Sequence, residues 1–94
     1  MSESIISPKK ECVVCHTTKN LHRHHVFYGT ANRSKSEQWG CWVWLCGWHH
    51  NGSNFGVHKD RDLDYALKKQ CQREWERRFG SREEFIKEFG KNYL

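Results

Sequence analysis

Apolar and polar positions along the chain predict two β-strands in its first half. Residues 21–28 alternate loosely and include Val, Phe and Tyr, which favour a strand. Residues 40–45 form the second predicted strand, in which two tryptophans alternate with smaller apolar residues on the opposite face. Both faces of this strand are apolar, so we expect both to be covered.

The second half of the chain predicts helices. Asp60 or Asp62 is expected to cap a long helix that runs to Phe79 and is ended by Gly80. Its charges are mixed in sign, and we expect them, Lys68 included, to form mainly a solvated face, with contacts to nucleic-acid phosphates as the alternative. Apolar residues recur at every fourth position of this helix: Leu63, Leu67, Cys71, Trp75 and Phe79.

A last short helix and a polar loop complete the predicted elements. Residues 81–84 have the pattern of a capping box, and Gly90 is the expected stop of the helix. Residues 29–37 are polar and predict a loop, in which Arg33 and Lys35 are placed to contact the phosphates of a nucleic acid. The apolar residues expected to face inward on the last helix are Phe85, Ile86 and Phe89.

Composition limits the class of protein. At 94 residues, 36% of them hydrophobic and 29% charged, the chain predicts one small α+β domain with little core and no membrane span. Residues 1–11 lack the apolar stretch of a secretory signal, so we expect a cytoplasmic protein. A small domain often needs a metal or disulfides for stability, and five cysteines without an export signal favour metal ligation. The net charge of +5 fits a polyanionic partner but does not identify one.

Two short motifs predict a structural zinc site. A Cys-x-x-Cys pair at 12–15 is matched by Cys-x-x-His at 46–49, and two such knuckles together supply the four ligands of tetrahedral Zn²⁺. The alternatives are buried free cysteines or a redox pair. Cys41 and Cys71 are left over and are expected in the core. The predicted zinc ligands are Cys12, Cys15, Cys46 and His49.

Histidines are concentrated around the two predicted strands. Six of the seven lie within residues 21–58, while His16 and His22 are expected to face solvent. His24 and His25 are neighbours on a strand and therefore point to opposite sides. One of them can hold a divalent metal ion while the other, as a neutral imidazole, accepts a proton from water.

With these motifs the chain resembles the HNH endonucleases, the zinc-stapled branch of the ββα-metal nucleases. The resemblance covers residues 12–58 and lies in CxxC, in His-His-Val-Phe and in Leu-Cys-x-x-His-His-Asn. It implies that His24 binds the catalytic metal, that His25 is the general base and that His50 is a second metal ligand. It also implies DNA as the substrate, cleaved with one divalent ion (Mg²⁺ or Mn²⁺, with Zn²⁺ or Ni²⁺ as alternatives) to leave a 5′-phosphate and a 3′-hydroxyl.

The chain departs from the family pattern at two positions. His49 stands where the family has a second-knuckle cysteine, an exchange that zinc tolerates. The middle asparagine of the family has no counterpart before the second knuckle, and Asn51 or Asn54 are candidates to replace it. We expect His58 to be a further ligand of the catalytic metal, reached across a glycine-rich loop.

The resemblance also implies how the domain is organised, and two alternative functions stay open. Residues 1–94 would form a single HNH domain, with residues 12–58 as its zinc knuckles and ββα-metal core and 60–94 as helical support. Small HNH proteins of bacteriophages and prophages look similar, which implies a bacterial host cell and weakly sequence-specific DNA binding. The alternatives are a non-catalytic zinc module that binds nucleic acid or protein, and a second structural zinc on the histidines.

Overall fold

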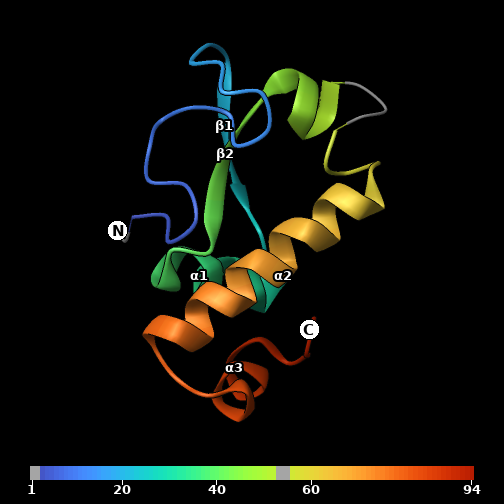
Figure 1. The fold of residues 1–94 in the computed structure, drawn as a ribbon. Coiled ribbons are helices and arrows are strands. Elements are labelled where there is room, and N and C mark those ends of the chain that lie inside the picture. The colour runs from blue at the N-terminus through green and yellow to red at the C-terminus, as the bar shows by residue number, and fades with distance from the viewer. Residues whose placement is uncertain (1–2, 53–55) are drawn as a thin grey trace.

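The protein has an α+β fold built on a two-stranded antiparallel sheet (Figure 1). The computed structural model describes residues 3–52 and 56–94. The order of elements is β1 (Leu21–His25), α1 (Thr30–Trp39), β2 (Trp42–Cys46), the π-helical turn η1 (Trp48–Gly52), α2 (Arg61–Arg78) and α3 (Arg82–Phe89). The predicted α+β class is confirmed. None of the helices in the described ranges is long and apolar enough to cross a membrane.

The sheet brings the two cysteine-bearing segments together. Leu21 pairs with Cys46 and His25 with Trp42, so β1 begins where β2 ends. The turn η1 follows β2 directly and therefore lies at that same end of the sheet (Figure 1). Both predicted strands are present, although β1 stops at His25, three residues before its predicted end.

Helix α1 replaces the loop predicted over residues 29–37, and that prediction was wrong. Ser36 is fully buried, and its hydroxyl donates to the carbonyl of Phe27 at 2.6 Å while accepting from the Phe27 N–H at 3.1 Å. Trp39 donates its indole N–H to Glu88 at 2.9 Å. Gly40 ends the helix at a φ of +75°, where an added Cβ would lie 2.2 Å from the carbonyl oxygen of Glu3. Contacts with distant parts of the chain therefore hold a helix that has no apolar periodicity.

The two C-terminal helices begin as predicted. The side chain of Asp60 accepts from the backbone N–H groups of Asp62 and Leu63, which makes it the N-cap of α2. Ser81 and Glu84 form the capping box of α3. Two details differ from expectation. Phe79 in right-handed conformation, rather than Gly80, is the C-cap of α2, and Ile86 is 37% exposed because α3 buries only Phe85 and Phe89.

The core lies between the sheet and the helices and is rich in aromatic rings. Phe27 from the segment after β1 packs against Phe85 and Phe89 of α3, with ring centres 5.4 and 4.6 Å apart. Trp75 of α2 contacts the Phe85 ring at 5.5 Å. Cys41 and Cys71 are fully buried, as predicted for core residues.

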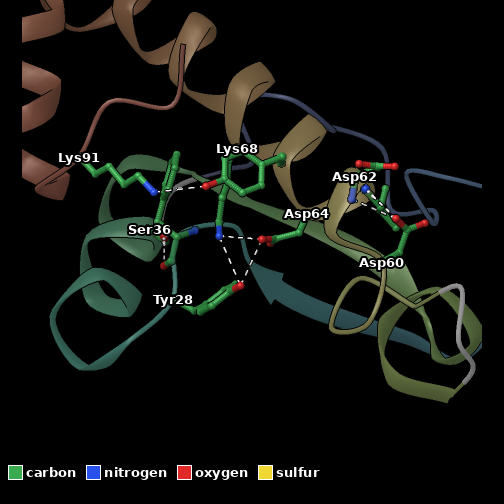
Figure 2. Close-up of polar contacts among 10 residues, drawn as sticks. Tyr28, Ser36, Asp60, Asp62, Asp64, Lys68 and Lys91 are labelled. Atoms are coloured by element: carbon green, nitrogen blue, oxygen red, sulfur yellow. Dashed lines mark hydrogen bonds and ion pairs between the residues drawn. The ribbon is translucent and has the colours of Figure 1, made fainter.

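A polar cluster ties α2 to the segment that follows β1. Lys68 is buried, and its ammonium donates to Asp64 at 2.8 Å and to the hydroxyl of Tyr28 at 3.3 Å (Figure 2). Tyr28 in turn donates to Asp64 at 3.2 Å. Lys68 therefore does not lie on the solvated face predicted for it, because its charge is paired inside the domain.

Candidate metal centres and the histidine cavity

The four predicted zinc ligands converge at the end of the sheet. The Sγ atoms of Cys12 and Cys46 lie 3.7 and 3.3 Å from Nδ1 of His49, and the Sγ atoms of Cys15 and Cys46 are 3.8 Å apart. In tetrahedral coordination, Zn–S bonds of about 2.3 Å and Zn–N bonds of about 2.0 Å separate the ligand atoms by roughly 3.5–3.8 Å. The donor set and its spacing therefore fit one Zn²⁺ ion.

Backbone hydrogen bonds fix both knuckles. The N–H of Cys12 donates to the carbonyl of Thr17, and the N–H of His16 donates to the carbonyl of Cys12, which closes the first knuckle. Val13 N–H donates to Trp44 of β2 at 2.9 Å and so attaches this knuckle to the sheet. The ligands are thus brought together by the chain itself.

The electrostatics of Cys12 favour its metal-binding form. Burial opposes ionisation of its thiol, but hydrogen bonds from the backbone of Cys15, Cys46 and Val14 outweigh burial and lower the pKa to about 6. A thiolate, not a thiol, is the zinc ligand. This environment therefore stabilises the state that binds Zn²⁺.

Three further histidines form a second cluster. His24 comes from β1, His50 from η1 and His58 from the segment before α2, and one ring nitrogen of each lies within 4.8 Å of the others. Nε2 of His50 is 3.2 Å from Nε2 of His58. The ring of His24 lies 5.4 Å from each of the other two, measured between centroids. The structure thus brings together the three histidines predicted to bind the catalytic metal.

His24 has the environment of a metal ligand. Its side chain is buried, and its Nε2 has no hydrogen-bond partner among the described residues. Burial, followed by the neighbouring His50 and His58, lowers the pKa of His24 from 6.5 to about 3. The ring is therefore neutral, and a buried nitrogen without a partner is costly. A metal ion held between the three imidazoles would satisfy it.

His22 belongs with this cluster, contrary to the expectation that it faces solvent. It is half-buried, and its Nδ1 lies 2.9 Å from Nδ1 of His50. A strand places residues two apart on one face, so the spacing between His22 and His24 was a signal that sequence reasoning missed. His16 is exposed as predicted.

His25 lines the same cavity but interacts with different groups. The cavity has a volume of about 580 Å³. Nε2 of His25 lies 2.8 Å from a carboxylate oxygen of Glu37, a residue of α1 that sequence reasoning did not find. The cavity is lined by the three clustered histidines, by His25, and by Arg23, Tyr28, Gly29 and Arg33.

The two cations predicted to bind nucleic acid lie in different places. Arg33 is exposed and lines the histidine cavity. Lys35 is half-buried, and its ammonium donates to the backbone carbonyl of Glu88 near the end of α3.

Of the two asparagines proposed for the missing family position, Asn54 lies outside the described residues, as does the side chain of Asn51.

Comparison with known proteins gives no relative. The chain matches no protein-family model, no curated protein and no solved structure at a significant level. The resemblance to HNH endonucleases therefore rests on the motifs, and the function is inferred from the arrangement of the side chains.

Proposed function

We propose that the protein is a metal-dependent DNA endonuclease or nickase of the HNH type. The observation that carries this proposal is the convergence of His24, His50 and His58 in one cavity that His25 also lines. A structural zinc at this position would explain why the three histidines converge. It would not explain why His25 lies beside them with its ring held by the Glu37 carboxylate.

The order of elements supports a ββα-metal arrangement. Two antiparallel strands supply His24 and lead into η1, which supplies His50, and α1 is inserted between the strands. In this proposal the Cys3His knuckle has a structural role. It joins the start of β1 to the end of β2 and so holds η1, with its histidine, over the strand that carries His24.

The clustered imidazoles are suited to a divalent ion of borderline softness. Within the described part of the chain the cluster has no carboxylate, and imidazole ligands favour Ni²⁺ or Zn²⁺ over Mg²⁺. Such an ion, when bound, would stabilise the charge that develops on the phosphoryl and leaving oxygens.

The other residues of the cavity would act on water and phosphate. His25 accepts the proton of the attacking water, which a neutral imidazole can do near physiological pH. Arg33, at the rim of the same cavity, contacts a phosphate oxygen of the DNA backbone. The net charge of +5 assists the approach of a polyanion.

A second candidate function is a zinc-stapled module that binds nucleic acid or a protein without cleaving it. One observation favours it: residues 40–42, Gly-Cys-Trp, lack the middle asparagine of the family. In that case the histidine cluster would hold a second structural zinc, and His25 would be dispensable.

Nicking of a supercoiled plasmid tests the proposal. Wild type, His25→Ala and the control His16→Ala are compared with Mg²⁺, Mn²⁺, Ni²⁺ and Zn²⁺ after exhaustive removal of contaminating metal. We expect metal-dependent nicking by wild type and by the control, and its loss in His25→Ala. DNA binding without nicking in every metal would favour the non-catalytic module, and equal nicking by His25→Ala would exclude His25 as the base.

A further inference from the structure

A carboxylate from α1 reaches back to the strand that carries the histidines. Oε2 of Glu37 lies 2.8 Å from Nε2 of His25, and Oε1 of the same carboxylate lies 3.1 Å from a terminal guanidinium nitrogen of Arg23. The side chains of Glu37, His25 and Arg23 are between 20% and 30% exposed, so the contacts are largely shielded from water. Glu37 therefore bridges two residues of β1 that flank His24.

Several contacts hold this carboxylate in place. The residue before it, Ser36, is fully buried and bonded to both backbone groups of Phe27, which fixes this turn of α1 against the end of β1. The guanidinium carbon of Arg23 lies 3.7 Å from the centre of the Trp42 ring, a cation–π contact that fixes the cation as well. Glu37 and its partner Arg23 are thus both held in place by packed neighbours.

The chemistry of the contact determines the state of the imidazole. An ionised carboxylate only accepts hydrogen bonds, so Nε2 of His25 must carry the proton. In the neutral ring the other nitrogen, Nδ1, then has the free electron pair. A base that removes a proton from water needs such a nitrogen, held in a fixed direction.

We propose that Glu37 is a positioning residue for His25. It selects the tautomer in which Nδ1 is the acceptor and holds the ring at the wall of the cavity, while Arg23 orients the carboxylate. The inference rests on the proposed function, in which His25 is the general base. The same device, a carboxylate that fixes the tautomer of a histidine, is general in hydrolytic enzymes and metal sites.

An isosteric substitution separates this role from simple packing. In Glu37→Gln the side chain keeps its size, but one oxygen becomes an NH₂ donor. Arg23 can only donate, so the amide oxygen turns towards Arg23 and the NH₂ group faces His25. Nε2 of His25 must then accept a hydrogen bond, so the ring proton moves to Nδ1. Nδ1, the nitrogen that the proposal requires as the proton acceptor, no longer has a free electron pair.

Nitrogen-15 NMR of the imidazole rings tests the tautomer directly. Spectra are recorded for wild type, Glu37→Gln and the control Glu83→Gln, an exposed carboxylate of α3. The His25 signals are assigned from their absence in His25→Asn. At a pH where the ring is neutral, we expect protonated Nε2 in wild type and the control, and protonated Nδ1 in Glu37→Gln. Circular dichroism and zinc content should be the same in all three.

Nicking kinetics supply the second measurement. We expect kcat of Glu37→Gln to fall about 10–100-fold with KM unchanged, while Glu83→Gln matches wild type. A wild-type His25 protonated on Nδ1, or an unchanged tautomer in Glu37→Gln, would overturn the proposal, as would full kcat in that variant. If the tautomer switches but no form of the protein nicks DNA, the contact stands and the nuclease function fails.

Discussion

The rings of His22 and His50 meet edge to face, with their Nδ1 atoms 2.9 Å apart and their planes at 89°. Nε2 of His50 faces His58 on its other side. If His50 binds a metal through Nε2, its Nδ1 carries the proton and donates it to His22. His22 would then orient a ligand without being one.

This arrangement predicts that His22→Ala weakens metal binding at the histidine cluster. Loss of a hydrogen-bond partner behind a ligand commonly lowers metal affinity about 10–100-fold. Calorimetric titration with Mn²⁺ or Zn²⁺, after the knuckle site has been filled, measures the change. His16→Ala is the matched control because His16 is exposed and away from the cluster. Equal affinity in His22→Ala and wild type would show that the contact between the two rings has no such role.

The knuckle site gives a prediction about folding. We expect the double variant Cys12→Ser/Cys15→Ser to lose one tightly held Zn²⁺ and to be largely unfolded, because structural zinc contributes on the order of 10 kcal/mol or more of apparent binding free energy. A domain of this size has a total stability of about 5–15 kcal/mol. Metal analysis and circular dichroism check both points, with Cys71→Ala as a thiol control outside the site. A folded, zinc-free double variant would contradict the assignment.

Local signals were sufficient for several parts of this fold. The caps Asp60 and Ser81 bond to backbone groups two or three residues away, so their effect is visible in a short stretch of sequence. The zinc ligands follow from two-residue spacings that define each knuckle. In the histidine cluster, His24 and His50 were predicted from the resemblance to the HNH family, and His58 was predicted as a ligand reached across the glycine-rich loop.

The features of the fold and the site that the sequence did not predict depend on contacts between residues far apart in the chain. Helix α1 has few apolar residues, and its register is held by Ser36 against Phe27 and by Trp39 against Glu88. Glu37 could not be recognised as the partner of His25 while its segment was taken for a loop. Ile86 was placed inside because three apolar residues suggested a wide buried face, but α3 packs on a narrower stripe.

Burial of His24 predicts a loss of stability in acid. Its pKa falls from 6.5 to about 3 on folding, so the unfolded chain binds more protons between these values. The contribution of neutral His24 is complete above pH 6.5 and is lost progressively as the pH falls towards 3. Each pKa unit corresponds to about 1.4 kcal/mol, so the effect is several kcal/mol.

Denaturant titrations across this pH range measure the effect. The free energy of unfolding of wild type should fall more steeply than that of His24→Asn, whose amide does not titrate. His16→Asn, at an exposed position, should follow wild type. Parallel curves for wild type and His24→Asn would mean that His24 is as easily protonated in the folded as in the unfolded chain.

The separate positions of Arg33 and Lys35 predict different effects of charge reversal. Arg33→Glu should weaken binding to a DNA duplex and reduce the slope of log affinity against log salt by about 1 or more, because Arg33 lines the cavity. Lys35→Glu should have a smaller effect on DNA binding and a larger one on stability, since its ammonium is bonded to the carbonyl of Glu88. Fluorescence anisotropy at several salt concentrations, with thermal melts of both variants, separates the two. A greater loss of affinity in Lys35→Glu would place the DNA elsewhere.

The different environments of His24 and His25 predict two distinct failures of catalysis. Nε2 of His24 is buried beside the other clustered histidines, so His24→Ala should weaken metal binding and be partly rescued by excess Mn²⁺.

His25 is hydrogen-bonded to Glu37 and lies outside the cluster. Its removal should leave metal content, fold and DNA affinity intact while lowering the rate about 10²–10⁴-fold, the usual cost of losing a general base. Nicking time courses of both variants across a metal titration make the comparison. No concentration of metal should restore His25→Ala, because in the proposed mechanism the missing imidazole is the acceptor for the proton of water. Rescue of His25→Ala by metal, with none for His24→Ala, would mean that the two histidines have exchanged roles.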